Sequence, residues 1–458
     1  AFVLSYPRTY AIVDEDAYLT QAWLFRTGRA TYEDSSLPPP HMTVESGGRL
    51  ASKYPPGASL ILLPFTLAGW RAPFAAGLVL ALAGTLLFCL IMRRMAPAAA
   101  PAWALLWLCY PAVTLYSRTL MSDLPAAVLV LAAFLALIRE RRLLAGLLLG
   151  FSVLVRYSNA VFVPVFGIIA LASARPRLRG VGAFLLGLVP GAALALGWNQ
   201  LAYGGPLSFP MYLTGEFSPA FLPRNAVYYG TSLLVLYPLM LILPLAVERR
   251  WRLAVALPAY AGLGLYCCFS YIYDVPGLAE RLTIGLRYLL PGLGFFILGT
   301  ALLLARLERL LPGFRVFRFA LLGLALAGSL AVHWRHDRYL AVQDRYRRLV
   351  YELVPDTALV VCNKDVSELF SHVWGDRNYL RFAEFEQSVA VDAAIAESAD
   401  PWAVLLQKPG RRSAAETAIF SSLLGRYPDA ALVVRESLPW SLEAWRLRPP
   451  AGPGQPVQ

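Results

Sequence analysis

Long apolar runs follow one another through most of the chain, separated by short segments that carry charge. A helix needs about 20 apolar residues to cross a bilayer, and several of these runs reach that length. The pattern predicts a polytopic α-helical membrane protein. Its spans are expected at residues 72–92, 101–117, 124–138, 143–155, 159–174, 181–200, 229–247, 252–271, 288–306 and 317–334.

Three stretches need separate interpretation. The apolar run 58–69 is too short to span a bilayer, so we expect a juxtamembrane helix near the outer surface. Arg156 interrupts the region 143–174, and two short or tilted helices are favoured there because one long span would put the arginines that follow on the wrong side. The opening AFVLSY is expected to be the outer end of a further span, for a total of about 10–11.

Arginines indicate which loops face the cytoplasm, because loops on that side carry an excess of Lys and Arg. One set of alternate loops holds fifteen arginines and the other holds five. The arginine-rich set is predicted to be cytoplasmic, and residues 1–57 and those after about 335 extracytoplasmic. The first set is Arg93, Arg94, Arg139, Arg141, Arg142, Arg175, Arg177, Arg179, Arg249, Arg250, Arg252, Arg306, Arg309, Arg315 and Arg318; the second is Arg118, Arg156, Arg224, Arg281 and Arg287.

The composition changes after about residue 335, where helix-like and β-rich stretches alternate. We expect a transmembrane domain over 1–334 with its first outer loop at about 9–57, a small extracytoplasmic α/β domain over 335–448, and a disordered tail over 449–458. The expected helices are 338–353 and 414–426, and the expected strands are 357–362, 402–407, 431–435 and 443–448.

Composition and charge narrow the class of protein further. With 58% hydrophobic and 15% charged residues, the chain differs from soluble domains, of which about 25% is charged. The net charge of +12 does not indicate nucleic-acid binding, because most of the excess lies in the short loops between spans. The five cysteines form neither a disulfide framework nor a CxxC metal motif.

Acidic residues are scarce between residues 46 and 334, and this scarcity helps to locate chemistry. Three of the seven lie among the cytoplasmic arginines and are simple loop charges, namely Glu140, Glu248 and Glu308. The outward-facing set is Asp14, Glu15 and Asp16 of the DEDAY segment, with Asp123, Glu216, Asp274 and Glu280.

Three adjacent carboxylates in DEDAY form the strongest candidate for acid–base chemistry. Like charges packed at a membrane surface raise the pKa of one carboxylate towards that of a usable base. A solvated loop is the alternative interpretation. Against it, Tyr18 and the apolar residues after it continue at helical spacing, as in a segment that lies on the membrane.

Asp123 and Lys53 are the next candidates. Asp123 precedes the helix that begins at Leu124 and Pro125, so it can serve as an N-cap, and capping does not exclude catalysis. Lys53 is one of only three lysines and stands in KYPPG before two prolines, which hold the chain extended. A point charge on a stiff loop suits a phosphate; interfacial snorkelling is the alternative.

Two Arg–Tyr pairs lie at the outer ends of spans, Arg287 with Tyr288 and Arg156 with Tyr157. An arginine near a membrane needs an anionic partner or water, so both are candidate ligands of a phosphate, or of a lipid headgroup. The histidines His41, His333 and His336 have no metal-ligand spacing and are interpreted as loop residues.

Together these motifs resemble those of the GT-C superfamily of integral-membrane glycosyltransferases, typified by protein O-mannosyltransferases and the aminoarabinose transferase that modifies lipid A. The resemblance covers about residues 9–310. The matching segments are DEDAY (Asp14, Glu15, Tyr18), KYPPG (Lys53, Tyr54, Pro55, Pro56), SRTLMSDLP (Asp123), NQLAYGGPL (199–207) and GLRYLLP (Arg287, Tyr288).

The resemblance implies an enzyme that takes a sugar from a polyprenyl-phosphate donor. By this match Asp14 is the catalytic base, Asp123 supports the acceptor or the site geometry, and Lys53 contacts the lipid phosphate. Tyr18, Tyr54, Arg156, Arg287 and Tyr288 complete the expected donor site, and Glu15 is a further catalytic candidate. A divalent metal is reported in some relatives, but no convincing His/acid pair for it is present.

The resulting hypothesis is an inverting hexosyl- or pentosyltransferase of the bacterial inner membrane, acting on an extracytoplasmic lipid, glycan or protein. A transporter or flippase of a lipid-linked or anionic substrate is the alternative, and it predicts charges deep within spans and symmetry between halves. A third possibility is a non-catalytic assembly protein whose outer domain binds partners.

Overall fold

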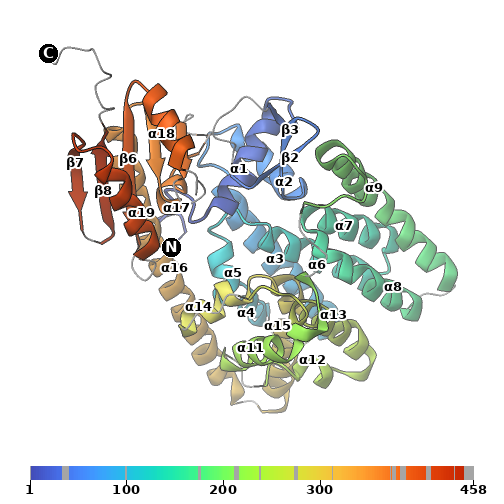
Figure 1. Cartoon of the computed structure of the whole chain (residues 1–458). Coiled ribbons are helices and arrows are strands. Elements are labelled where there is room, and N and C mark those ends of the chain that lie inside the picture. Colours follow the sequence, from blue (N-terminus) through green and yellow to red (C-terminus); the bar gives the residue numbers. More distant parts are fainter. Residues whose placement is uncertain are drawn as a thin grey trace.

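The computed structural model of the chain describes residues 2–33, 41–97, 101–173, 177–210, 216–236, 239–272, 277–311, 313–371, 373, 378–381, 388–408, 414–437 and 439–447. A large helical domain carries a smaller sheet-based domain at one end, and helix α1 lies between the two (Figure 1). The predicted tail 449–458 and the outward-facing Asp274 fall outside the described residues.

Each predicted span in the described residues corresponds to a helix or to a series of shorter ones. Among the helices that the structure describes, four are long and apolar enough to cross a membrane by length and composition, α3, α9, α15 and α16. The helices are α3 (Phe74–Met95), η1 (Pro101–Ala104), α4 (Leu105–Leu108), α5 (Pro111–Tyr116), α6 (Asp123–Ile138), α7 (Arg142–Val155), η2 (Tyr157–Val161), α8 (Phe162–Ser173), α9 (Arg177–Tyr203), η3 (Pro219–Phe221), α11 (Leu222–Leu236), α12 (Leu243–Ala246), α13 (Arg249–Cys267), α14 (Leu278–Leu282), η4 (Ile284–Leu286), α15 (Leu290–Leu310) and α16 (Phe314–Leu353).

Two boundaries agree with the sequence interpretation. Helix α7 ends at Val155, and Arg156 has extended backbone angles before the short η2, so the region 143–174 is two helices and not one. The short run after KYPPG is a helix, α2 (Gly57–Thr66). The predicted span 101–117 is broken instead, because Pro111 has no N–H to donate and begins the new helix α5.

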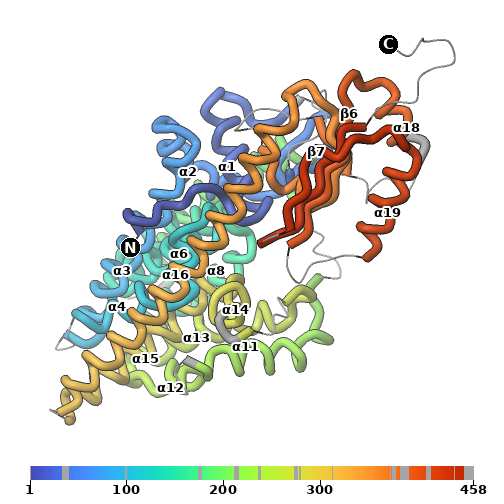
Figure 2. The backbone as a smooth tube through the Cα atoms, turned by 90° about the vertical axis from the view of Figure 1, so that its left-hand side faces the viewer, coloured from blue at the N-terminus to red at the C-terminus, as the bar shows by residue number. Residues whose placement is uncertain are grey.

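Helix α16 is one continuous element of 40 residues, about 60 Å long, and it crosses residue 335 without a break. Figure 2 shows it running beside the helical domain and on to the C-terminal sheet. The interpretation of His333 and His336 as loop residues is therefore wrong, since both lie inside this helix. The composition change marks where the helix leaves its apolar surroundings.

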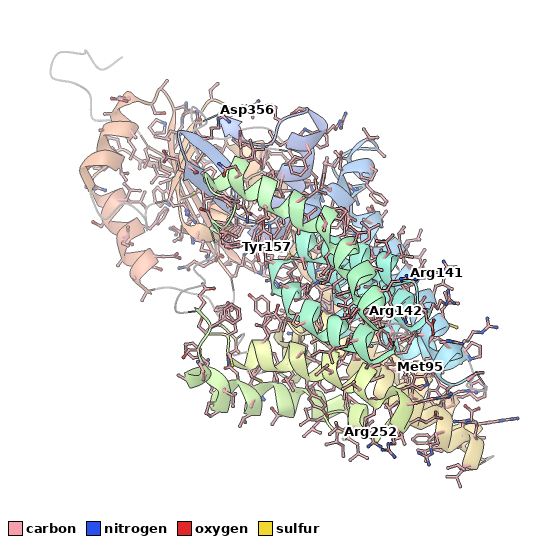
Figure 3. The ribbon with its side chains drawn as sticks, turned by 90° about the vertical axis from the view of Figure 1, so that its right-hand side faces the viewer. Met95, Arg141, Arg142, Tyr157, Arg252 and Asp356 are labelled. Carbon is pink, nitrogen blue, oxygen red and sulfur yellow. The ribbon has the colours of Figure 1, made fainter. Side chains whose placement is uncertain are left out.

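The arginines Arg141, Arg142 and Arg252 lie at the end of the helical domain that points away from the C-terminal domain, together with Met95 (Figure 3). Asp356, which follows α16, lies at the opposite end of the molecule, and Tyr157 lies between the two. Three of the arginines assigned to one side of the membrane thus share one end of the fold.

The first outer region begins with a helix, as the helical spacing from Tyr18 onwards predicts, and continues with a small sheet that the sequence patterns did not predict. Helix α1 (Val13–Arg26) is followed by a small antiparallel sheet of order β1-β3-β2, with β1 (Tyr32–Glu33), β2 (Thr43–Ser46) and β3 (Arg49–Ser52). Gly47 and Gly48 join β2 to β3 with positive φ angles, which glycine adopts without strain.

The C-terminal domain is a five-stranded mixed sheet of order β5-β4-β6-β8-β7. Strand β6 is buried on both faces, which explains its uninterrupted apolar sequence. The predicted strands correspond to β4 (Leu359–Cys362), β6 (Pro401–Gln407), β7 (Ala431–Glu436) and β8 (Ser441–Arg446), and the predicted helix 414–426 to α19 (Ala414–Gly425); β5 (Asn378–Arg381), α17 (Lys364–Ser367) and α18 (Ser388–Glu397) were not predicted.

Helices α7 and α9 pack backbone to backbone through glycines. A methyl group built on Gly146 would lie 2.0 Å from the Phe184 carbonyl oxygen, and one on Gly187 would lie 2.2 Å from the Leu143 oxygen. Glycines four residues apart let membrane helices approach this closely. The paired helices support the Arg156 end of α7, which belongs to the candidate site.

Replacing Gly187 with Ala is expected to lower the free energy of unfolding by about 1–3 kcal/mol, because the methyl group overpacks the contact between α7 and α9. The matched control is Gly197→Ala on the same helix, where a methyl group meets no atom within 4 Å. Thermal unfolding of the detergent-purified variants measures the difference. Equal melting temperatures for the two variants would contradict this packing.

Candidate active site

The three carboxylates of DEDAY form the first turn of α1, where the positive end of the helix dipole favours acids. Successive residues of a helix point about 100° apart, so the three side chains diverge. Asp14 Oδ2 accepts a 2.9 Å hydrogen bond from Arg287 Nη2. The Asp14 side chain is 16% exposed, so it remains accessible to solvent.

Glu15 points from the same turn into the protein and is buried. Its two oxygens accept 2.9 Å hydrogen bonds from the backbone N–H groups of Ala11 and Leu120. Burial raises the pKa of Glu15 to about 7, although the two N–H donors oppose that shift. Glu15 therefore fastens α1 to the loop that leads into α6, and both of its oxygens are already engaged.

Asp16 is also buried and faces the C-terminal domain. Its Oδ1 accepts hydrogen bonds from the hydroxyl of Ser371 and, at 3.3 Å, from Thr20 Oγ1. Its Oδ2 is buried with no hydrogen-bond partner among the described residues. Burial raises the pKa of Asp16 to about 7, opposed by the two hydroxyl donors.

Asp123 is the first residue of α6, and Ser122 occupies the N-cap position. The Asp123 side chain is fully buried. Asp123 Oδ1 is ion-paired with Arg156 Nη1, and Oδ2 lies 3.3 Å from Arg287 Nε. The predicted capping role does not match this geometry, because both carboxylate oxygens bind arginines.

Arg287 is the group shared by both acids. One of its nitrogens binds Asp14 and another binds Asp123, so residues from α1, α6 and the segment before α15 meet at one guanidinium. Arg156, which directly follows α7, joins the same network because it is ion-paired with Asp123. The structure thus brings together four of the predicted site residues.

Aromatic rings surround this charge cluster. The Tyr288 ring centroid lies 5.1 Å from Arg156 Cζ and 5.3 Å from Arg287 Cζ, within cation–π range. Tyr266 stacks on Tyr288 at 5.6 Å and was not predicted from the sequence. Nearby, the Tyr157 hydroxyl donates to Asn199 Oδ1 at 2.6 Å, which brings the NQLAYGGPL segment to the same region.

Tyr18 and Tyr54 form a second aromatic pair beside Asp14. Their rings stack with centroids 4.7 Å apart, and Tyr18 donates a 2.9 Å hydrogen bond to Ser122 Oγ, next to Asp123. Burial, followed by the negative charge of Asp14, raises the pKa of Tyr54. Lys53 Nζ lies 5.4 Å from the centroid of the Tyr54 ring.

The glycine of KYPPG explains how this segment comes to lie beside Arg156. A methyl group on Gly57 would lie 2.6 Å from the backbone nitrogen of Val155, the last residue of α7. Only glycine permits this approach between α2 and α7. The start of α2, four residues after Lys53, is therefore packed against the end of α7 from which Arg156 projects.

Arg118 is a buried residue that the sequence interpretation counted only as a weak loop charge. Its guanidinium donates to the Ser5 carbonyl at 2.8 Å, lies 3.1 Å from Asp337 Oδ1 and contacts His333 and His336. The only sequence signal for this role was its place in SRTLMSDLP. Arg118 holds the loop before Asp123 against α16.

The cluster combines the parts needed for acid–base chemistry beside an anion. Asp14 is an accessible carboxylate, while Arg156 and Arg287 supply guanidinium groups that match phosphate geometry. Within the ranges that the structure describes, no three His, Cys, Asp or Glu side chains meet as metal ligands.

Comparisons with known proteins give a match to a family model over part of the chain and similar folds over most of it. Residues 53–214 match the model of glycosyltransferase family 87. The chain is similar to the crystal structure of ArnT from Cupriavidus metallidurans bound to undecaprenyl phosphate, with 14% identity and a TM-score of 0.63 over 99% of this chain and 97% of that chain. The apo state of ArnT gives 14% and 0.60 over 96% and 95%.

A more distant structural relative is the oligosaccharyltransferase of Archaeoglobus fulgidus in the apo form. It has 11% identity and a TM-score of 0.51, over 87% of this chain and 66% of that chain. No curated protein matches the sequence. The match to ArnT extends over 99% of this chain, which confirms the predicted helical membrane-protein fold with a small C-terminal sheet region. The number of spans and the side on which the C-terminal domain lies stay predictions.

Stability is expected to fall as the pH rises from about 4 to about 7, because the folded protein retains a proton on Asp16 that the unfolded chain has lost. Glu15 acts in the same direction. Asp16→Asn cannot titrate, so it should remove roughly half of this decline. Melting temperatures at pH 5 and pH 7.5 measure the effect, with Asp392→Asn as the exposed-acid control; a wild-type profile in Asp16→Asn would contradict the assignment.

Proposed function

We propose that this chain, a membrane glycosyltransferase with the GT-C fold, transfers a sugar from a polyprenyl-phosphate donor to an extracytoplasmic lipid, glycan or protein. The observation that carries the proposal is the joining of Asp14, Asp123, Arg156 and Arg287 in one network. The family match, the bound undecaprenyl phosphate of the ArnT relative and the membrane helices support it.

Asp14 is the group best suited to act as the base. Of the three acids in α1 it alone keeps partial exposure, whereas both Glu15 and Asp16 are buried and hold neighbouring segments. Its carboxylate is held in place by the 2.9 Å hydrogen bond from Arg287 Nη2, at the edge of the charge cluster. We therefore assign Glu15 and Asp16 to positioning and Asp14 to catalysis.

In the proposed reaction the acceptor hydroxyl or amine attacks the anomeric carbon of the donor from the face opposite the phosphate. The bond from that carbon to the phosphate oxygen breaks with inversion, and the proton of the acceptor passes to Asp14. The lipid phosphate leaves with the electron pair. The positive charges of Lys53 and of Arg287 or Arg156 stabilise the negative charge that develops on the phosphate.

Asp123 has a supporting role in this scheme. It is buried between the two arginines and fixes the direction in which each guanidinium points. A guanidinium held in place before the donor binds needs little reorganisation when charge develops on the leaving phosphate. The Tyr288 ring lies against Arg287 and the buried Tyr18 ring stacks on Tyr54, and both limit the motion of the cluster.

The charge arrangement favours transfer over transport. The acids and cations of the site lie where α1, α6 and the ends of α7 and α15 meet, and are joined to one another. Such a network is typical of a fixed catalytic site. We propose the bacterial inner membrane as its location, with the site and the C-terminal domain on the extracytoplasmic side.

Asp14→Asn is expected to abolish sugar transfer while the protein remains folded, because the amide cannot accept the acceptor proton. Release of polyprenyl phosphate from a panel of polyprenyl-phosphate sugars measures activity, and the melting temperature checks the fold. Glu248→Gln is the control, since Glu248 is an exposed acid that pairs with Arg250 before α13. Transfer retained by Asp14→Asn would refute the assignment of the base.

Lys53→Ala is expected to raise the KM for the donor about ten- to a hundredfold, because a hydrogen bond to a charged group contributes about 1.5–3 kcal/mol. Lys53→Arg keeps the positive charge and should restore most of the affinity. Initial rates at increasing donor concentration measure the effect. A change in the KM for the acceptor alone would contradict a role in phosphate binding.

A further inference from the structure

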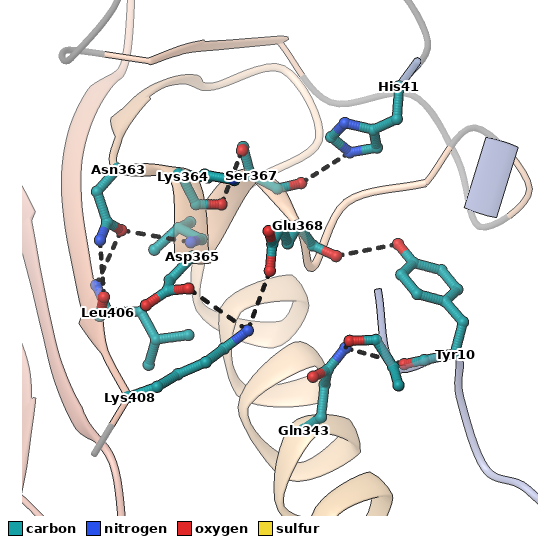
Figure 4. Close-up of polar contacts among 12 residues, drawn as sticks. Tyr10, His41, Gln343, Asn363, Lys364, Asp365, Ser367, Glu368, Leu406 and Lys408 are labelled. Carbon is teal, nitrogen blue, oxygen red and sulfur yellow. Dashed lines mark hydrogen bonds and ion pairs between the residues drawn. The ribbon is translucent and has the colours of Figure 1, made fainter. Parts of the chain in front are cut away.

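The C-terminal domain touches the chain on both sides of Asp14. Tyr10 is buried, and its hydroxyl lies 3.1 Å from the Glu368 carbonyl oxygen (Figure 4). It also lies 2.9 Å from the carbonyl oxygen of Phe370, in the same segment after α17. Gln343 of α16 donates a 2.9 Å hydrogen bond to the Tyr10 carbonyl. The residues just before α1 are thus held by two parts of the C-terminal region.

The C-terminal domain also contacts a residue that follows Asp14 in the sequence, Asp16. The Ser371 hydroxyl donates to Asp16 Oδ1 in the first turn of α1. His41, in the loop before β2, contacts the Ser367 carbonyl oxygen at 3.0 Å (Figure 4). One short segment, residues 367–371, therefore contacts the approach to α1, its first turn and the first outer loop.

A buried ion cluster makes this segment rigid. Lys408 lies 3.1 Å from Glu368 Oε2 and 3.5 Å from Asp365 Oδ1, and its side chain is only 6% exposed (Figure 4). Asn363 caps α17 by accepting from the Val366 N–H, and it donates to the Leu406 carbonyl of β6. The contacts on Tyr10 and Asp16 are thus built on the sheet of the domain.

We propose that segment 367–371 of the C-terminal domain positions Asp14 for proton transfer, through Tyr10 and Ser371 as positioning residues. The proposal rests on the assignment of Asp14 as the base. Asp14 lies four residues after Tyr10 and two before Asp16, so displacement of either anchor moves its carboxylate. A displacement of about 1 Å in a reacting group can lower a rate about a hundredfold.

This arrangement gives the C-terminal domain a part in the reaction itself. Its sheet and α16 carry apolar cores of their own, so the contacts with α1 are not needed to bury its apolar residues. The contacts with Tyr10 and with the first turn of α1 are hydrogen bonds. A domain attached only as a binding module has no need to hold the turn that carries the base.

The test removes one hydroxyl at a time. Tyr10→Phe and Ser371→Ala should each lower kcat about ten- to a hundredfold, with donor KM within about twofold of wild type, because positioning affects the transition state and not donor binding. Ser371→Thr keeps a side-chain hydroxyl that can donate to Asp16, so its kcat should be close to that of wild type. The matched control is Tyr427→Phe, which removes a hydroxyl bonded to Asp392, away from α1, and should leave kcat unchanged.

Hydrogen–deuterium exchange of residues 9–20 gives a readout that does not depend on activity. Tyr10→Phe and Ser371→Ala should speed exchange there, and Tyr427→Phe should not. Unchanged exchange, or a kcat loss in Tyr427→Phe equal to that in Tyr10→Phe, overturns the proposal. Wild-type protein that releases no polyprenyl phosphate from any donor would instead refute the proposed function, and exchange would still decide whether the segment anchors α1.

Discussion

The Arg287 guanidinium is the interaction on which the rest of the site depends. It binds Asp14 and Asp123 at once, and those acids arrive from α1 and α6. A buried charge is tolerated only when it is paired, so removing any one member leaves another uncompensated. The packing of α7 on α9, the glycine of KYPPG and the buried Arg118 all serve to bring the loops to this point.

The DEDAY segment shows how one helical turn can serve three purposes. Asp14 faces the charge cluster, Glu15 fastens the loop before α6, and Asp16 faces the C-terminal domain. The division follows from the 100° between neighbouring side chains, which sends adjacent residues to different neighbours. A turn fixed on three sides holds a reactive carboxylate in one orientation with little entropy left to lose.

Much of the fold was accessible from local patterns. Apolar runs gave most helices, the interruption at Arg156 gave the boundary between α7 and α8, and β-rich runs gave four strands of the C-terminal sheet. The hairpin of β2 and β3 and strand β5 were not predicted, because they are short and their pairing partners lie elsewhere in the chain. His333 and His336 were misplaced because polarity was taken as the end of a helix that continues.

The sequence by itself determined which groups are available for chemistry, because few acids and one lysine remain once the basic loops are set aside. It also determined the membrane class, through the length of its apolar runs. Only the tertiary structure decided how the acids divide their work and which arginines they meet. Burial and partners depend on contacts between distant segments, such as Arg287 with Asp123 across 164 residues and with Asp14 across 273. The bond from Ser371 to Asp16, across 355 residues, leaves no pattern in the sequence around either residue.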